Sequence, residues 1–300
     1  MNRPNFFLVG APKCGTTALC VYLNTHPNVF LSKPKEPHFF AEEFRFPDMT
    51  TWDEYLALFA DARSHHKVIG EASVHYLCSA LAMDKIHEYD PKAKIIAMVR
   101  NPVDVVYSYH SQLLYNVGDE NEEDFEKAWH LQNSRLEGKN LPPLSKNPAT
   151  LQYKNIGSMG TQIEKLFSIF PQEQIKVIIF DDFKADTQGI YEEVLRFLDI
   201  PSNNKTDFSQ VNKNKTHRLQ LLSKITQKPP KLLVETSDKV KDVLGVQSFG
   251  VIRTLRNINK KEFKRPPLDP KFRALLVQEF ADEVTKLSRL LNRDLSHWKN

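Results

Sequence analysis

The chain has 300 residues, 41% hydrophobic and 26% charged, with 41 basic residues against 37 acidic ones and a formal net charge of +4. This length and composition fit a globular protein with one large or two small α/β domains. So mild a charge does not favour nucleic acid as the partner, because DNA-binding domains usually concentrate basic residues on one face. It is compatible with a local basic pocket for a small anionic ligand.

The cysteines and the apolar runs indicate which cellular compartment to expect. Three cysteines, Cys14, Cys20 and Cys78, are an odd number without C-x-x-C spacing, so we expect neither a disulfide framework nor a zinc site. No apolar run is long enough to predict a membrane span. The segment before Gly10 also lacks the apolar run of a signal peptide. We therefore expect a cytoplasmic protein with no membrane span.

The first hundred residues alternate strands with helices. Residues 5–9 form a continuous apolar run before a glycine, which is typical of a strand buried on both faces of a parallel sheet. Residues 16–26 have helical apolar spacing and stop before Pro27. The same reasoning predicts strands over 28–31, 68–71 and 94–99, and helices over 52–59 and 79–89. Asn101 and Pro102 then form a helix start, with Asn as N-cap and Pro at the first helical position.

The remaining two thirds of the chain continue this pattern less clearly. Residues 138–150 and 202–217 have the polar and turn-forming composition of loops. Between and after them we predict helices over 156–170, 191–198 and 272–291 and a strand over 175–180. Strands that alternate with helices imply βαβ units and a parallel sheet, and we prefer a single domain.

The segment Gly10 to Thr17 (GAPKCGTT) joins the first strand to the first helix and has the composition of an anion site. Backbone N–H groups of the loop and of the first helical turn point at an anion, and the helix dipole adds favourable potential. Lys13 adds a mobile positive charge, and Thr16 and Thr17 add hydroxyl donors. The alternative is a glycine-bounded turn with incidental Lys and Thr, since short glycine motifs are weak evidence alone.

The position of the lysine separates this loop from that of ATP-dependent enzymes. In the pattern G-x-x-x-x-G-K-[ST] the lysine follows the second glycine and reaches the β- and γ-phosphates. Here Thr16 stands at that position, and Lys13 lies within the loop, where it can contact the bridging oxygen of a group transferred from the 5′ side of a nucleotide. A P-loop kinase using ATP is kept as the alternative, and it would also need a magnesium ligand.

Two segments resemble the motifs of one enzyme family. Phe6 to Thr17 (FFLVGAPKCGTT) is similar to the 5′-phosphosulfate loop of sulfotransferases that use 3′-phosphoadenylyl sulfate (PAPS). Residues 19–40, with HPNV and KEPHFF, are similar to the bacterial members and to the glycan-modifying branch. Val99 to Pro102 (VRNP), with Ser108 beyond it, resembles the family's 3′-phosphate motif. The similarity runs from residue 5 to about residue 218.

The resemblance implies a PAPS-dependent sulfotransferase that releases adenosine 3′,5′-bisphosphate. It implies an α/β fold of the P-loop type, with three αβα layers and a central parallel sheet flanked by helices, as one domain over residues 1–300 whose part 219–300 is helical. Because the transferred group bears only one negative charge, an obligatory magnesium is less expected than in phosphoryl transfer. The implied cofactor-binding residues are Lys13, Cys14, Gly15, Thr16, Thr17, Arg100, Ser108, Lys215 and Thr216.

Arg100 and Ser108 have a physical reason to bind a phosphate. Arg100 is predicted at the carboxyl end of a parallel strand, the edge where open α/β sheets bind ligands, and its planar fork can donate two parallel hydrogen bonds. Ser108 lies about 9 Å along the next helix. The alternative is a structural salt bridge from Arg100 to Asp104 or Glu71, with Ser108 a neutral helix residue.

Three further sites are implied only by position. Lys215 and Thr216 lie in a basic polar loop that in the family closes over the cofactor, and a solvated loop is the alternative. Ser158 and Gly160 match a region that lies near the nucleotide in the family. Glu71 matches a position from which it can orient the acceptor or buttress Arg100.

Glu36 and His38, in KEPHFF, are the candidates for the catalytic base. If this stretch is extended, residues two apart face the same side and both can line one cleft. The resemblance to the glycan-modifying branch implies Glu36 as general base, with His38 as helper or rival, and Lys13 stabilising the leaving group. The alternatives are a surface pairing of Glu36 with Lys33 or Lys35 and a structural role for His38.

The acceptor is expected to be a small molecule or a glycan, sulfated on a hydroxyl or, less readily, on an amine. The glycan enzymes tend to have a lysine after the glutamate that matches Glu71, and this chain has Ala72 there. That departure weakens the expectation of a sulfated polysaccharide as acceptor. The sequence predicts neither the identity of the acceptor nor the oligomeric state.

Overall fold

The computed structural model describes residues 2–44, 49–116, 119–143, 145, 147–209, 211, 215–217, 260–262 and 265–299. The chain divides into two compact units. The first comprises Met1–Tyr109, Asn147–Asn212 and Leu268–Asn300, and the second comprises His110–Lys146 and Lys213–Pro267. The single domain over residues 1–300 stays a prediction.

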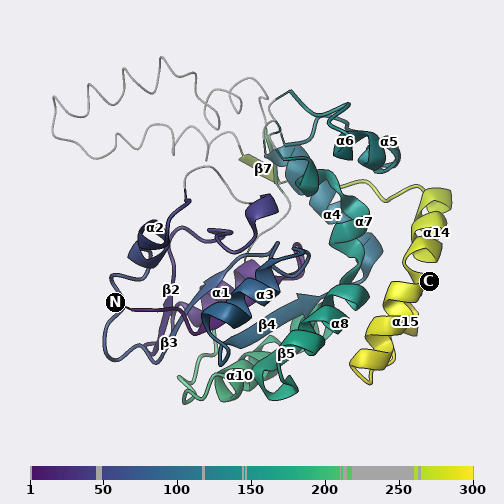
Figure 1. Ribbon diagram of the computed structural model, residues 1–300. Coiled ribbons are helices and arrows are strands. Elements are labelled where there is room, and N and C mark those ends of the chain that lie inside the picture. The colour runs from purple at the N-terminus through teal and green to yellow at the C-terminus, as the bar shows by residue number, and fades with distance from the viewer. Residues whose placement is uncertain are drawn as a thin grey trace. The chain divides into compact units, whose positions relative to one another are not determined.

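The first unit is built on a five-stranded sheet in which every strand is parallel to its neighbours (Figure 1). In spatial order the strands are β2 (Val29–Leu31), β3 (Val68–Ala72), β1 (Phe6–Gly10), β4 (Lys94–Val99) and β5 (Ile175–Ile179). The central strand β1 is buried along its whole length. A strand covered on both faces has no solvent side, which is why its sequence is a continuous apolar run. All five predicted strands are confirmed.

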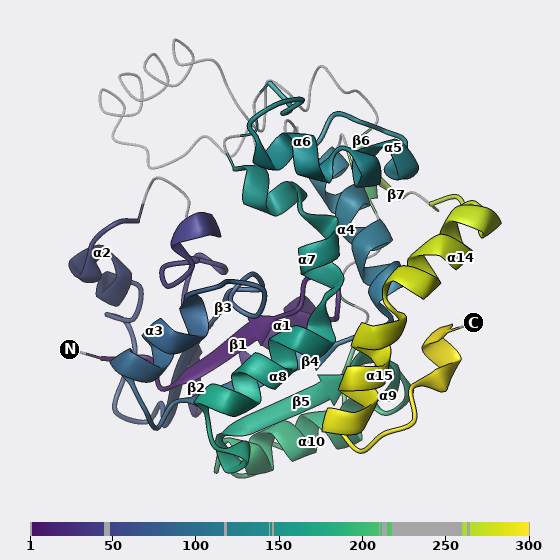
Figure 2. The same ribbon diagram turned by 45° about the vertical axis from the view of Figure 1, so that its right-hand side comes forward.

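Helices cover both faces of this sheet. The chain crosses the sheet in one direction from β1 to β2 and in the other from β3 to β4 and from β4 to β5. Right-handed crossovers therefore place α1 (Thr16–Leu23) on one face, and α3 (Ala82–Tyr89) and α8 (Met159–Ile169) on the other. Figure 2 shows α3 and α8 on the near side of the sheet. The expected three-layer αβα fold is confirmed.

The remaining helices of the first unit are short and follow the strands or the chain's end. They are α2 (Trp52–Ala57), α7 (Tyr153–Gly157), α9 (Phe180–Ala185), α10 (Thr187–Phe197), α14 (Pro270–Glu279) and α15 (Ala281–Leu290), with the 3-10 helices η1 (Glu42–Phe44), η2 (Pro148–Leu151), η3 (Gln172–Gln174) and η4 (Ser296–Lys299). The helix α4 (Pro102–Tyr115) runs from the first unit into the second, and the Asn101 side chain caps its start by accepting from the Val103 amide (3.0 Å). In the part of the chain that the structure covers, no helix has the length and apolar character needed to cross a membrane. The cytoplasmic location stays a prediction.

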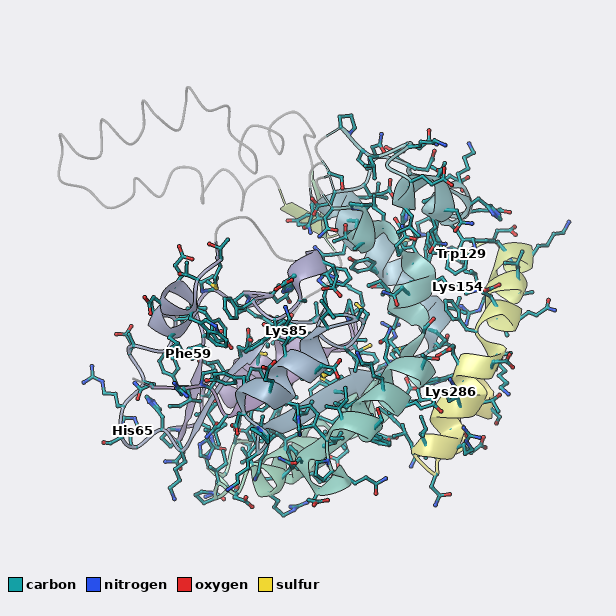
Figure 3. The ribbon with its side chains drawn as sticks, viewed as in Figure 1. Phe59, His65, Lys85, Trp129, Lys154 and Lys286 are labelled. Atoms are coloured by element: carbon teal, nitrogen blue, oxygen red, sulfur yellow. The ribbon has the colours of Figure 1, made fainter. Side chains whose placement is uncertain are left out.

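The C-terminal helix differs from its prediction. Residues 272–291 were expected as one helix, and the structure breaks them at Phe280, which is buried and leaves the helical conformation (φ −96°, ψ 6°). Its ring lies so close to Gly157 that a Cβ there would stand 2.5 Å from the Phe280 ring. Lys286 then joins α15 to α8 by donating to Glu164 (2.9 Å). Figure 3 labels Lys286, between α15 and α8. Neither Pro nor Gly marks this break, so local composition could not predict it.

The second unit holds α5 (Phe125–His130), α6 (Gln132–Leu136) and a two-stranded antiparallel sheet of β6 (Lys215–His217) and β7 (Lys260–Glu262). Its interior contains an ion pair between Arg135 and Glu120, both fully buried, with two hydrogen bonds of 2.7 Å. The prediction that residues 202–217 are loop throughout is wrong at β6. The partner strand lies more than forty residues further along the sequence, so nothing local indicates the pairing.

Candidate functional site

The order of the strands places a ligand-binding point between β1 and β4. From β1 the chain continues to β2, at one edge of the sheet. From β4 it continues to β5, at the opposite edge. Such a change of direction opens a crevice outside the carboxyl ends of the two strands, where open α/β sheets bind ligands. Residues 10–17 follow β1 there, and we call them the anion loop. Arg100 follows β4 at the same edge.

The anion loop is held in a tight conformation that its glycines allow. Gly10 has φ 138°, and a Cβ there would lie 2.4 Å from the Val74 carbonyl oxygen. Gly15, the N-cap of α1, has φ 94° and supplies no side chain to bond the first-turn amides. The Ala18 amide donates to the Gly15 carbonyl (2.9 Å), and the amides of Thr16 and Thr17, with the positive end of the helix dipole, can accommodate an external anion. Thr16 is buried and Thr17 half-buried in this first turn.

Two cations lie within electrostatic reach of the loop. Burial raises the pKa of the Cys14 thiol to about 12, while the charges of Arg100 and Lys13 act in the opposite direction. The thiol therefore stays protonated and donates to the Pro12 carbonyl (3.4 Å). Cys14 can therefore bind an anion through its backbone, and its side chain does not act as a thiolate. Lys13 itself has a left-handed backbone (φ 63°) in the middle of the loop.

Arg100 joins the ends of the two strands. One of its terminal nitrogens donates to the Lys13 carbonyl (3.4 Å), and the other pairs with Asp104 (3.3 Å). The guanidinium also lies over the Phe180 ring, 4.9 Å from its centroid. The pairing with Asp104 that the sequence left open is present, and a pairing with Glu71 is not. Ser108 lies on α4, two turns beyond Arg100, and is 8% exposed.

Glu36 and His38 lie in the segment after β2 that we call the base turn (residues 36–40). Both have left-handed backbones, with φ 66° at Glu36 and 53° at His38, so the expectation of an extended stretch is wrong. The two side chains consequently have different surroundings. The Glu36 side chain is 35% exposed and forms an ion pair with Lys35, one of the pairings that the sequence left open. His38 is 1% exposed.

His38 belongs to a buried chain of hydrogen-bonding groups. Its Nε2 lies 2.7 Å from Nδ1 of His75, whose Nε2 lies 3.0 Å from the Tyr109 hydroxyl. The Phe44 ring stacks on His75. Burial lowers the pKa of His38 to about 4 and that of His75 well below its ordinary value. Both imidazoles are therefore neutral at neutral pH, and the burial of His38 favours a structural role for it.

Glu71 is fully buried at the end of β3. Its carboxylate accepts hydrogen bonds from the hydroxyls of Tyr55 (2.9 Å), Tyr76 (2.7 Å) and Ser73 (3.1 Å). Burial raises the pKa of Glu71 to about 7, against the opposing effect of these donors. It is not a buttress of Arg100. Sequence reasoning missed Tyr55 and Tyr76, which carry no motif.

Lys215, Thr216, Ser158 and Gly160 are the remaining residues that the sequence predicts near the cofactor. Lys215 and Thr216 lie in β6, opposite Glu262 and Lys261, in the second unit. The rest of their expected loop, Lys213, Asn214 and Arg218, lies outside the described residues. Gly160 allows α15 to approach α8, because a Cβ would stand 2.4 Å from the Glu283 carbonyl oxygen, and the Ser158 hydroxyl donates to the Lys154 carbonyl (2.8 Å). The cofactor contacts of these residues stay predictions.

Comparison with known proteins assigns the class. Residues 3–242 match the family model of the sulfotransferase domain, so the chain belongs to the sulfotransferase family. A solved sulfotransferase from Alicyclobacillus acidocaldarius is 25% identical, with a TM-score of 0.72 over all of both chains. The donor substrate of this family is PAPS, and the chain is a PAPS-dependent sulfotransferase domain. The kinase alternative is therefore set aside.

Curated relatives include enzymes that modify carbohydrates. Mouse carbohydrate sulfotransferase 15 is 26% identical over 249 residues, which cover 66% of this chain and 44% of that protein. Mouse bifunctional heparan sulfate N-deacetylase/N-sulfotransferase 3 is 26% identical over 302 residues, covering 97% of this chain and 30% of that protein. The chain thus spans less than half the length of these curated relatives.

Proposed function

We propose that this sulfotransferase transfers the sulfuryl group of PAPS to a hydroxyl, less readily an amine, of a small-molecule or glycan acceptor, with Glu36 as general base and Lys13 stabilising the leaving group. The observation that carries the proposal is the arrangement at the carboxyl edge of the sheet. There the anion loop places Lys13 beside Arg100, and the base turn gives Glu36 access to solvent.

The chemistry of the anion loop fits a phosphosulfate. Its donors are the backbone amides of Thr16 and Thr17, their hydroxyls and the ammonium of Lys13. All are donors that suit anionic oxygens. The two glycines let the loop pack closely against Val74 and Phe180. When bound, PAPS supplies the sulfuryl group and, as leaving group, adenosine 3′,5′-bisphosphate. The 5′ end belongs with the anion loop, and the 3′-phosphate with Arg100 and Ser108.

Lys13 has the position and charge to stabilise the leaving oxygen. It lies in the middle of the loop, and its backbone carbonyl accepts from Arg100, which restrains the lysine's place in the loop. A positive charge already present beside the leaving oxygen stabilises the negative charge that develops there during the reaction. This role differs from simple binding, because it matters most when negative charge appears on the leaving oxygen.

Glu36 is a better base candidate than His38. A general base must reach the acceptor's hydroxyl, and Glu36 is partly exposed, whereas His38 is buried against His75. The low pKa of His38 also makes its imidazole a weak proton acceptor.

A glycan is one of the two acceptor classes in this proposal. It is supported by the similarity to carbohydrate sulfotransferase 15 and to a heparan sulfate N-deacetylase/N-sulfotransferase. Ala72, in place of the lysine expected in the glycan branch, is 3% exposed and offers no cation to a sulfated polysaccharide. An acceptor without sulfate groups fits this side chain better.

A screen of PAPS consumption tests the proposal. It compares phenols, alkyl alcohols, acyl-chain β-hydroxyls, amines and unsulfated and sulfated glycans. We expect turnover with a hydroxyl acceptor, lower turnover with the matching amine, and loss of turnover in Glu36→Gln. Exclusive turnover of amines, or of sulfated polysaccharides, would overturn the acceptor assignment.

A further inference from the structure

A buried carboxylate is linked to the base turn through two hydroxyl groups. Ser73 and Tyr76 each donate to Glu71 (3.1 and 2.7 Å). The Ser73 hydroxyl also accepts from the His38 amide (3.0 Å), and the Tyr76 hydroxyl accepts from the Phe40 amide (3.2 Å). Each hydroxyl therefore bridges the end of β3 to the backbone of the base turn.

The base turn has a backbone that requires such support. Glu36 and His38 both adopt the left-handed conformation, which costs a non-glycine residue of order 1 kcal/mol and persists only where surrounding contacts determine it. The amides of His38 and Phe40 are the points at which the two hydroxyls hold it. A third hydrogen bond, from the Ala41 amide to the His38 carbonyl (3.1 Å), closes the turn itself.

The carboxylate fixes the direction of both bridges. A hydroxyl has one proton, so a hydroxyl that donates to a carboxylate presents only lone pairs to its other neighbour. That orientation is what a backbone N–H needs. Among the residues that the structure covers, neither Lys nor Arg forms an ion pair with Glu71, so in the ionised form, above its pKa of about 7, its charge is compensated by hydroxyl donors. Glu71 is thus oriented toward the base turn and not toward a cationic partner.

We propose that Glu71, acting through Ser73 and Tyr76, is a positioning residue that holds the base turn in the conformation from which Glu36 reaches the acceptor. This rests on the proposed role of Glu36 as base. It gives a function to the carboxylate at the end of β3 other than contact with the acceptor or with Arg100. The hydroxyls transmit the effect, so their loss is predicted to lower turnover without weakening the cofactor site.

Tyr55 provides a matched control for Tyr76. Both tyrosines donate to the same oxygen of Glu71, Oε1, so Tyr55→Phe and Tyr76→Phe each remove one hydroxyl from one carboxylate. Only the Tyr76 hydroxyl also accepts from the base turn. The Tyr55 ring stacks on Phe39 (4.4 Å), and phenylalanine keeps that ring. Both variants remove one hydrogen bond from the Glu71 carboxylate, so a difference in kcat between them is due to the base turn.

The test measures kcat, KM for PAPS, thermal stability and amide hydrogen exchange in the full chain. We expect Tyr76→Phe and Ser73→Ala to lower kcat by about 10- to 100-fold, since a misplacement of about 1 Å has that effect, with KM for PAPS nearly unchanged. Exchange at the Phe40 amide should accelerate in Tyr76→Phe but not in Tyr55→Phe. Tyr55→Phe should lose less thermal stability than Tyr76→Phe, because it leaves no base-turn amide without an acceptor, and it should keep kcat near that of the unsubstituted protein.

Equal kcat values in the two tyrosine variants would overturn the positioning role, as would faster exchange at Phe40 without any loss of kcat. Glu36→Gln, measured in parallel, tests the base separately. If Glu36→Gln keeps full activity while Tyr76→Phe loses turnover, the base assignment fails and the link from Glu71 to Glu36 fails with it. If Glu36→Gln is inactive and Tyr76→Phe is fully active, only the positioning role fails.

Discussion

The Nε2 atom of His38 lies 2.7 Å from Nδ1 of His75 in the interior of the first unit, and the second nitrogen of His75 meets the Tyr109 hydroxyl. Two imidazoles this close cannot both be charged at low cost, and both are buried. The pair therefore requires neutral histidines, which makes the fold sensitive to acid.

His38 should make the protein less stable as the pH falls. Its pKa is about 4 in the folded protein and about 6.5 when unfolded, so the unfolded state binds more protons between these values. Stability present above pH 6.5 is lost as the pH falls toward 4. We compare the free energy of unfolding in urea between the unsubstituted protein and His38→Gln. The difference between them should shrink by roughly 3 kcal/mol as the pH falls across this range. Glu71 is present in both proteins, so the opposite effect of its protonation on stability cancels in the comparison. A difference in unfolding free energy that stays constant with pH would contradict the prediction.

Arg100 should recognise the 3′-phosphate in particular. We expect Arg100→Ala to weaken binding of adenosine 3′,5′-bisphosphate by about 10- to 100-fold, the value of a charged hydrogen bond, and binding of adenosine 5′-phosphate far less. Calorimetric titration of both nucleotides measures this ratio. Asp104→Asn removes the structural partner of Arg100 and serves as control. Equal losses for both nucleotides would mean that Arg100 only supports the anion loop through the Lys13 carbonyl.

Lys13 should act on turnover more than on affinity. Lys13→Ala is expected to lower kcat by about 100-fold or more, because a preorganised charge on the leaving group is removed, with a smaller change in the affinity for adenosine 3′,5′-bisphosphate. Single-turnover rates and nucleotide titration separate the two effects. Lys271→Ala, an exposed lysine on α14, is the control for loss of one positive charge. A loss confined to nucleotide affinity would assign Lys13 to binding alone.

The sequence predicts the parts of this fold whose signals are local. The β1 run and the Asn101–Pro102 helix start depend on neighbouring residues, and both are found where expected. The anion loop was also predictable, because its glycines lie next to the strand and helix that it joins. These features form the part of the site that is proposed to bind the cofactor.

The part of the site proposed to face the acceptor depends on contacts between distant residues. Tyr55 reaches Glu71 from α2, 16 residues away, and His38 meets a histidine 37 residues away. The left-handed backbone of Glu36 occurs at a residue type that rarely adopts it, and histidine adopts it too seldom for the sequence to predict it at His38. The His38 and Phe40 amides donate to the Ser73 and Tyr76 hydroxyls, and only the folded chain brings these groups together.

The central claim is that Glu36 takes the acceptor's proton. The most direct measurement is the single-turnover rate of Glu36→Gln with PAPS and an acceptor found in the screen, together with a titration of adenosine 3′,5′-bisphosphate. Glu88→Gln, an exposed carboxylate on α3, is the matched control. The rate of Glu36→Gln should fall by about 100-fold or more, the typical contribution of a general base, while nucleotide affinity stays unchanged. A rate equal to that of the unsubstituted protein would contradict the assignment.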